Sequence, residues 1–462
     1  VNQFVLHSYV HQPTEAKPGI TLGRFGLSFN RHNTWWPQAS AYFEEQARAQ
    51  YLLQKGKTVS DVLVYLGDKL PVQESADKTA MLLPDVRFNY CNAEVLNNRI
   101  SVKDGKLMLD NETAFQFLLV PDSLLDLTTV QKIESLVQQG TTVVVPRPVA
   151  TLSLKNYDSN NALLQKITAS LWGKINGKTI TENRYGKGKI IWGRPVSQII
   201  KENNFIPDLQ VKGGKMEDLM YIHKKVDDTD IYYVVNRSNN QPAQLEASFR
   251  VRDKTPSLWN PVDGTTYQLA LYAESNGVTT LPLSLRPRQS LFIVFQKGTS
   301  RQHFIKLQDA AGNSLFPATS AVPSAVPKVY FNTTATNFEM TSATGGQYSL
   351  TSNTGAITKA ALQDAKKMVI SEIKGTVTLL NEPQLGPIAI QNFQSLTRFD
   401  NPLVKYYSGT AVYQMELNIP PDFIGGNTVL MQLDQFGSTA QVEWNGSEAG
   451  IVWEPGYQLD IT

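Results

Sequence analysis

The sequence has little cysteine and no excess of charge. Cys91 is the only cysteine among 462 residues, so no disulfide within the chain can stabilise the fold. Lysine and arginine together number 43 and aspartate and glutamate 41, which leaves a net charge of +2. A charge this small and dispersed attracts neither nucleic acid nor an anionic membrane strongly. We therefore expect a neutral partner and no nucleic acid.

Long apolar runs and nucleotide motifs are also missing. No stretch approaches the roughly 20 apolar residues of a membrane-spanning helix, and no basic and apolar export signal opens the chain. No Gly-x-Gly-x-x-Gly pattern follows an apolar strand, and the glycines at 186–189 precede a strand rather than a helix. The sequence therefore predicts no membrane span and no nucleotide site.

The length predicts several domains, because single cores stop growing at roughly 250–300 residues. Residues 1–57 predict one βα unit, with a strand at Phe4–Tyr9 and a helix between Pro37 and Gly56. A lone βα unit cannot bury both faces of its strand, so it packs on the next domain or is the last unit of a TIM-type barrel. Both ends of the chain are apolar and abrupt, and we expect truncation at both.

Residues 58–215 predict a Rossmann-like or flavodoxin-like α/β domain. Continuous apolar strands are expected at 61–67, 115–121 and 142–145, and an amphipathic helix at Thr128–Gln139 is closed by Gly140. Continuous apolar strands that alternate with helices are typical of a parallel sheet covered on both faces.

The remaining sequence predicts a mixed multidomain protein that ends in β-structure. Residues 216–299 alternate polar and apolar positions between turns, which indicates a small β-sandwich. Residues 300–327 are rich in Ala, Gly, Ser and Pro and predict a linker. Residues 328–462 predict a jelly-roll, sugar-binding-like β-sandwich that we expect to be incomplete.

The residues that can carry chemistry gather in the opening βα unit. Three of the five histidines lie within the first 32 residues, and alternate residues of a strand share one side. In a parallel barrel, the C-terminal strand ends and the loops after them line the active site. Aromatic faces pack on sugar C–H groups, while imidazole, guanidinium and amide groups bind hydroxyls. The predicted substrate-binding residues are His7, Tyr9, His11, Arg31, Asn33, Trp35 and Trp36. Alternatively, the tryptophans plug the barrel mouth and the histidines are structural donors.

Several of these strings resemble glycoside hydrolase family 106, the α-L-rhamnosidases. The opening part resembles the last barrel strand and helix of that family in the strings His7–Pro13, Pro18–Gly19, Phe29–Trp36, Arg48–Gly56 and Asp61–Val62. Weaker similarity follows at Asn89–Glu94, Val102–Gly105, Trp259–Gly264, Lys405–Tyr413 and Trp444–Thr462. The resemblance implies an enzyme that removes terminal α-L-rhamnosyl residues from a rhamnose-containing glycan.

The resemblance also implies where the catalytic groups lie. Family members use two glutamates on earlier barrel strands and invert the anomeric centre, which requires two carboxyl groups about 6.5–9.5 Å apart. This chain is expected to begin after both, so no catalytic residue is assigned to it, and Glu15 lacks the family context of a catalytic residue. A calcium ion that contacts the sugar is implied as well, with unknown ligands. A polymeric substrate implies a bacterial protein in the periplasm, on the cell surface or secreted.

Two other functions remain open. The first is a non-catalytic carbohydrate-binding or accessory module, in which Trp444, Trp453 and Tyr457 hold glycan, although the same aromatics can pack between two sheets. The second is a fragment of a family 2 or family 42 β-galactosidase, which the strings between His7 and Trp36 fit less well.

Overall fold

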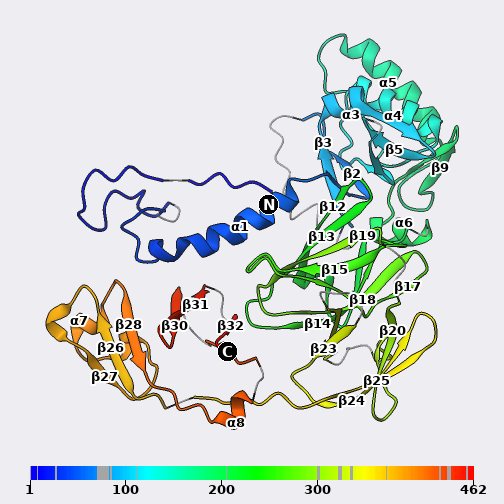
Figure 1. The fold of residues 1–462 in the computed structure, drawn as a ribbon. Helices are drawn as coiled ribbons and strands as arrows, with labels where there is room; N and C mark the ends of the chain where they lie inside the picture. Colours follow the sequence, from blue (N-terminus) through cyan, green and yellow to red (C-terminus); the bar gives the residue numbers. More distant parts are fainter. Residues whose placement is uncertain are drawn as a thin grey trace.

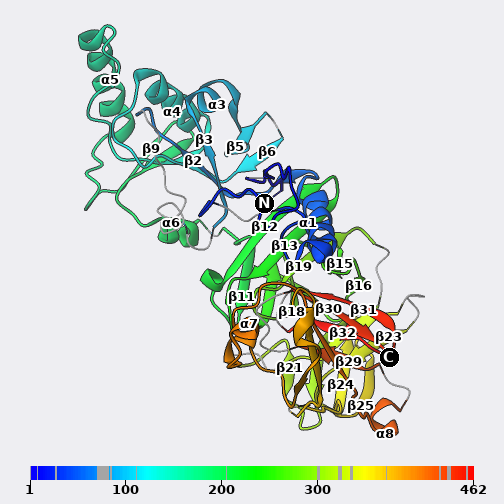
Figure 2. The same ribbon diagram turned by 90° about the vertical axis from the view of Figure 1, so that its left-hand side faces the viewer.

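The fold is described from a computed structural model. The structure describes residues 2–7, 9–25, 29–69, 83, 86–110, 112–203, 205–298, 302–320, 325–332, 337–370, 372–425, 428–433, 439–453 and 456–462. Figures 1 and 2 show an α/β unit at one end, a β-sandwich in the middle and smaller sheets at the other end.

The opening segment forms a helix but not the predicted strand. Residues 4–7 and 9 are irregular and residue 8 lies outside the described part, so the prediction of a strand at Phe4–Tyr9 is wrong for the residues described. A strand needs a neighbour for its backbone groups, and no described strand pairs with this segment, in which Val5 is 88% exposed. A 3-10 helix, η1 (Trp36–Gln38), leads into α1 (Ala39–Leu53), in agreement with the predicted helix.

Gly56 brings the chain out of α1. Residues other than glycine rarely adopt its φ of +55°, and an added Cβ would lie 2.0 Å from the carbonyl oxygen of Lys225. Directly after Gly56 the chain enters β1 (Lys57–Thr58), which pairs with strand β12 of the sandwich.

A parallel sheet lies where continuous apolar strands predict one. Its strand order is β3-β2-β7-β8-β10-β9, and every neighbouring pair is parallel except β10 and β9. Taken from β2, the five parallel strands follow the order 2-1-3-4-5 of doubly wound sheets. The bounds are β2 (Val62–Tyr65), β3 (Phe88–Cys91), β7 (Phe117–Leu119), β8 (Thr142–Val144), β9 (Glu182–Tyr185) and β10 (Gly188–Ile191).

Helices cover both faces of this sheet. One core joins Leu63, Leu118 and Val143 of the sheet to α3, α4 and α5, and a second joins Val64 and Phe117 to α6. Alternate strand residues therefore enter different cores, which is why the strands read as continuous apolar runs. The helices are α3 (Ala93–Arg99), α4 (Leu127–Gln139), α5 (Tyr157–Trp172) and α6 (Val196–Glu202), and a small sheet contains β4 (Ile100–Lys103), β5 (Lys106–Leu109) and β6 (Thr113–Phe115).

Two sheets form the central β-sandwich, in the orders β1-β12-β13-β19-β15-β16 and β11-β14-β18-β17. Their facing sides share one core that includes Tyr232, Phe249 and Ile293. The sandwich takes in strands before residue 216, the predicted boundary, because β1 and β11 pair with its sheets. The strands are β11 (Leu209–Lys212), β12 (Leu219–Val226), β13 (Thr229–Asn236), β14 (Ala243–Phe249), β15 (Thr255–Trp259), β16 (Thr266–Gln268), β17 (Ala273–Ser275), β18 (Val278–Leu285) and β19 (Ser290–Gln296), with η2 at Met216–Asp218.

Helix α1 covers the outer face of the first sandwich sheet. Ala49 and Leu53 pack with Ile231, Phe292 and Val294 in a separate apolar cluster. Strand β19 is consequently buried on both sides, and its residues 290–295 are all buried. The helix that follows the predicted site is thus fixed to the sandwich and not to the parallel sheet.

The predicted linker at 300–327 is wrong. It contains β20 (Phe304–Asp309) and β21 (Ser314–Phe316), which pair with each other, and β20 also pairs with β24. Phe304, Leu307 and Phe316 enter a core with Leu271 of the sandwich. Residues rich in Ala, Gly, Ser and Pro lie between the two strands, at 310–313, and after β21, and this composition concealed the spacing of apolar residues within the strands.

The rest of the chain forms several small sheets among the described residues, so a single jelly roll over 328–462 is not what the strand pairing gives. Strand β24 pairs with β20, from before residue 328, as well as with β25. The strands are β22 (Lys328–Phe331), β23 (Phe338–Thr341), β24 (Gly346–Ser352), β25 (Ile357–Leu362), β26 (Gly375–Leu379), β27 (Ile388–Ile390), β28 (Ala411–Met415), β29 (Leu430–Gln432), β30 (Ala440–Trp444), β31 (Ser447–Val452) and β32 (Gln458–Asp460). The short helices are η3 (Pro383–Leu385), η4 (Leu396–Arg398), α7 (Pro402–Lys405) and α8 (Pro421–Ile424).

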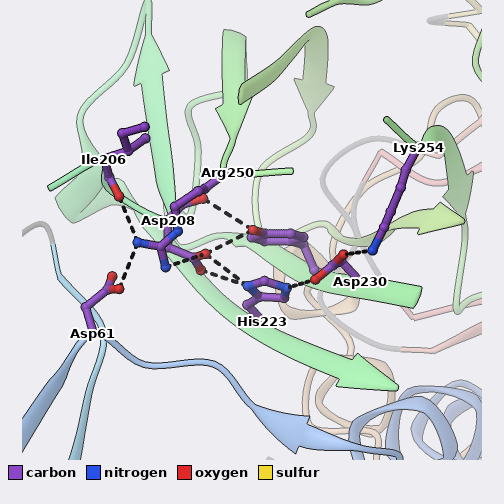
Figure 3. A network of polar contacts seen from close by, with 8 residues as sticks. Asp61, Ile206, Asp208, His223, Asp230, Arg250 and Lys254 are labelled. Atoms are coloured by element: carbon purple, nitrogen blue, oxygen red, sulfur yellow. Dashed lines mark hydrogen bonds and ion pairs between the residues drawn. The ribbon is translucent and has the colours of Figure 1, made fainter. Parts of the chain in front are cut away.

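A buried polar network joins the α/β unit to the sandwich (Figure 3). The ring of His223 lies between two carboxylates, with Nδ1 3.0 Å from Asp208 and Nε2 2.9 Å from Asp230. Arg250 bridges Asp208 at 3.2 Å and Asp61, just before β2, at 2.8 Å. These contacts cross directly from the parallel sheet to both sheets of the sandwich.

The network requires a protonated His223. Both ring nitrogens face carboxylate oxygens, so both must donate, which only the imidazolium can do. Burial lowers the pKa of His223, but the hydrogen bonds to Asp208 and Asp230 outweigh it and raise the pKa above its ordinary value. With Arg250 and Lys254, which pairs with Asp230, the imidazolium balances the three carboxylates.

Removing one carboxylate is expected to destabilise the protein strongly. The Asp208→Ala substitution leaves His223 and Arg250 buried without their shared partner. It is expected to lower the free energy of unfolding by about 3–5 kcal/mol. Urea unfolding of the wild type and the variant measures it. The control Asp253→Asn removes an exposed negative charge 3.7 Å from Arg252, suits the φ of +58° at this position, and is expected to leave the midpoint unchanged. Equal effects of the two substitutions would contradict the role given to the network.

The protonation of His223 also predicts a pH dependence. Its folded pKa lies above the unfolded value of about 6.5, so its contribution is complete below pH 6.5 and is lost as the pH rises through the folded pKa. Urea midpoints measured upward from pH 6 are expected to fall for the wild type. In the His223→Gln variant, which starts from a lower midpoint, this fall is expected to be absent. The same fall in both proteins would assign it to another group.

Candidate functional site

Six aromatic rings gather where the N-terminal loop meets the start of α1. This aromatic cluster consists of Tyr9, Phe29, Trp35, Trp36, Tyr42 and Phe43. The ring of Trp36 lies 6.1 Å from each of Tyr9, Trp35 and Phe43, measured between centroids. Both tryptophans are half-buried and Tyr9 is 63% exposed, so part of the cluster faces solvent. The structure therefore brings together Tyr9, Trp35 and Trp36 from the predicted site.

Arg31 holds the preceding loop instead of pointing into open space. Its guanidinium donates to Glu15 at 2.7 Å and to the carbonyl oxygens of Gln12 and Thr14 at 3.0 and 3.2 Å. The hydrogen bond from Arg31 is also the main cause of the lowered pKa of Glu15. Glu15 is thus an ionised partner of Arg31, which is not the state of a general acid.

Buried polar groups fix the same loop. His32 is 8% exposed, and its Nε2 lies 2.9 Å from the carbonyl oxygen of Thr14. The amide of Gln12 exchanges two hydrogen bonds with the backbone of Ile20, and the side chain of Asn30 accepts from the backbone N–H of His32. Together with Arg31, these contacts bring residues 12–20 beside 30–32 without regular secondary structure.

The other predicted residues belong to none of the ring pairs of the aromatic cluster. His7 and His11 are exposed in the irregular segment before the loop, and Asn33 is half-buried in the turn that precedes η1, where its carbonyl oxygen accepts from Trp36. The alternation of His7, Tyr9 and His11 on one side depended on the predicted strand, which is not formed in the described residues. Their assignment to a substrate site remains a prediction.

The C-terminal part contributes a contact that the sequence did not reveal. Trp453, after β31, donates its indole N–H to Glu45 of α1 at 3.1 Å, and Gln441 of β30 lies 3.2 Å from Gln38. Burial raises the pKa of Glu45, while the hydrogen bond from Trp453 opposes the rise. The terminal hairpin therefore supports the helix that carries part of the aromatic cluster.

Sequence reasoning missed several neighbours of the site. Phe29, Tyr42 and Phe43 complete the aromatic cluster, and Gln12 orders its loop. His32, one of the three early histidines, has the structural role that was the alternative for them. Tyr42 and Phe43 lie one to two helical turns after Trp36, and this spacing was a signal that could have identified them. The partnership of Glu45 with Trp453 spans 408 positions and left no local signal.

The described residues do not fit a calcium site. Among them, no group of three or more His, Cys, Asp or Glu side chains is placed to hold a metal ion. The carboxylate nearest to the predicted residues, Glu15, is already paired with Arg31. In the same described part of the chain, no helix combines the length and apolarity needed to cross a bilayer.

Aromatic faces grouped beside polar loop residues define a surface of the kind that glycosidases present to sugars. The family model described as alpha-L-rhamnosidase, glycoside hydrolase family 106, matches residues 1–273. The chain belongs to this family.

One solved relative is a rhamnosidase by name, and other proteins that the chain resembles carry different names. The solved rhamnosidase from Novosphingobium sp. PP1Y is 25% identical, with a TM-score of 0.74 over 100% of this chain and 39% of its own. A curated protein of Formosa agariphila named putative beta-glucuronidase is 32% identical over 308 residues, 65% of this chain and 25% of its own. The chain thus spans less than half of either relative. A β-galactosidase from Bacillus circulans sp. alkalophilus is 9% identical, with a TM-score of only 0.34 over 55% of this chain and 44% of its own.

The contacts of Arg31 predict a local effect of its removal. The Arg31→Ala substitution is expected to free residues 12–20, because three acceptors lose their shared donor. Hydrogen–deuterium exchange of the backbone at 12–20 is expected to become faster, while exchange in α1 stays the same. The control Glu44→Ala removes an exposed partner of Arg48 on α1 and leaves the loop intact. Unchanged exchange at 12–20 in Arg31→Ala would contradict this role.

Proposed function

We propose that the chain is the C-terminal part of an enzyme that removes terminal α-L-rhamnosyl residues from polysaccharides with inversion at the anomeric carbon. The aromatic cluster is the observation that carries this proposal, because it offers indole and phenol faces to a sugar in a chain of the α-L-rhamnosidase family. Within the cluster, Tyr9, Trp35 and Trp36 form one wall of the substrate pocket. His7, His11, Arg31 and Asn33 belong to its surroundings.

The two catalytic carboxylates belong to the part of the enzyme outside this chain. Inversion requires a general acid and a general base about 6.5–9.5 Å apart with a water between them. Near the cluster, Glu15 is ionised against Arg31, and Glu45 accepts a hydrogen bond from Trp453. Both carboxylates have structural partners, which supports a position for the acid and base on preceding barrel strands.

A neutral sugar suits the cluster better than a uronic acid. The curated relative carries a glucuronidase name, and a glucuronoside presents a carboxylate that needs a cationic partner. Arg31, the arginine of the predicted site, is already neutralised by Glu15 at 2.7 Å. This pairing favours rhamnosides over glucuronosides.

The accessory units hold the pocket wall in place. The flavodoxin-like α/β unit, the sandwich and the sugar-binding-like terminal sheets correspond to the domains that follow the barrel. The sandwich and the terminal hairpin both contact α1. The parent enzyme acts in the periplasm or at the cell surface, where a polymeric substrate is accessible.

Activity assays test the proposal directly. The longer natural protein is expected to hydrolyse 4-nitrophenyl α-L-rhamnopyranoside, with β-L-rhamnose as the first product in a proton NMR time course. The present chain alone is expected to be inactive. Cleavage by this chain would contradict the position of the carboxylates, and preference for 4-nitrophenyl β-D-glucuronide would contradict the substrate.

A variant of the longer protein tests the aromatic wall. The Trp36→Ala substitution is expected to raise KM about three- to tenfold, because an aromatic contact contributes roughly 0.5–1.5 kcal/mol. Tyr51 is a matched control, since it lies on α1, the helix that directly follows η1 with Trp36, is 62% exposed and belongs to no ring pair of the cluster. The Tyr51→Ala variant is expected to keep the KM of the wild type. Equal KM values for all three proteins would exclude Trp36 from the pocket.

A further inference from the structure

We propose that the central sandwich carries a second sugar-binding site, for one unit of a neutral saccharide, on the outer face of β15, β16 and the end of β19. This binding function is additional to the proposed hydrolysis, because binding at this site does not require the catalytic carboxylates. A cavity of about 270 Å³ marks the place, and its walls come from these three strands and the two residues after β19. The volume lies just below the range of about 300–1,000 Å³ for drug-sized ligands, so it suits a single sugar ring.

The strand register gathers the polar side chains of this face. Ser257 pairs with Gln268, Trp259 with Thr266, and Thr255 with Gln296. Directly paired residues of antiparallel strands point to the same side, and alternate residues of β15 share that side. Three hydroxyls and two amides therefore surround one indole in a patch only three strands wide.

This patch differs from the rest of the same sheet face. Nearer α1, the face consists of Ile231, Phe292 and Val294, which are buried by the helix. At the cavity it changes to hydroxyl and amide groups, and Thr266 and Gln296 are exposed. The apolar part stabilises the fold, whereas Thr266 and Gln296 of the polar part are open to solvent or a ligand.

Trp259 connects the two parts. It packs against the cluster that includes Ala49 and Leu53, and it also lines the cavity. Its indole N–H donates to Ser257 at 2.9 Å, and the Ser257 hydroxyl donates to the carbonyl oxygen of Val294 at 3.1 Å. The indole is thus held in one orientation, so a sugar ring meets a preorganised aromatic side chain.

The charges around the cavity select a neutral ligand. Lys297 is the charged residue among its lining residues, and it pairs with Asp228 at 2.7 Å. An anionic sugar finds no unpaired cation among these described lining residues, and a purely apolar ligand takes the exposed polar side chains of Thr266 and Gln296 out of water without offering them a hydrogen bond. A ligand with many hydroxyls and an apolar ring face, which is the description of a neutral pyranose, satisfies both conditions.

Saturation-transfer NMR on the present chain tests the site with L-rhamnose, D-galactose and D-mannose as probes. Millimolar binding of at least one sugar is expected. The Gln268→Ala and Gln296→Ala variants are expected to weaken it at least fivefold, and both keep Trp259 and its packing. Gln244→Ala is the matched control, because Gln244 lies on β14 of the other sheet and bonds Ser284 at 2.9 Å. It is expected to bind as the wild type does.

The outcomes separate this site from the aromatic cluster. Binding that survives Trp36→Ala and is lost in Gln296→Ala supports the sandwich site. Binding that is lost in Trp36→Ala and unchanged in both glutamine variants assigns the sugar to the aromatic cluster and overturns the proposal. Failure of all three sugars to bind at 50 mM also overturns it. Neither result bears on hydrolysis by the longer protein, which is measured separately.

Discussion

The buried pairing of His223 with Asp208 and Asp230 is the interaction on which the arrangement of this chain depends. A chain with one cysteine has no internal disulfide to fasten its units together. Arg250 extends the pairing to Asp61 at the start of the parallel sheet, so the α/β unit and the sandwich share one charge-balanced centre. The buried charges fix the orientation of the two units more specifically than apolar contact alone, because each hydrogen bond forms only within a narrow range of distances and angles.

The sandwich then positions the candidate site through α1. One side of this helix packs on Ile231, Phe292 and Val294, while Glu45 meets Trp453 of the terminal hairpin. The start of α1 carries Tyr42 and Phe43, and Trp36 lies in η1 directly before it. A wall for substrate is thus built on an element with partners from two distant parts of the sequence, and the loop before it is ordered by Arg31 and His32.

Local patterns predicted the elements well and their assembly poorly. Continuous apolar strands and the Gly140 stop identified the parallel sheet and α4, because burial on both faces leaves a direct trace in the sequence. The segment at 4–9 carried the pattern of a strand, but a strand also needs neighbours, which no local pattern supplies. Similarly, residues 304–316 were hidden by their turn composition. In the site, the two predicted tryptophans do lie side by side. The ion pair of Arg31 with Glu15 was not predicted, because it depends on the backbone path of the loop between two residues 16 positions apart.

The contact between Trp453 and Glu45 has a consequence for how the protein is made. The two residues are 408 positions apart, so a ribosome that adds roughly 5–20 residues per second needs about 20–80 s between them. During that time α1 already exists, with a carboxylate whose final partner has not been synthesised. A helix made early in this chain is therefore completed late, and a chain stopped before residue 453 leaves Glu45 without its indole partner.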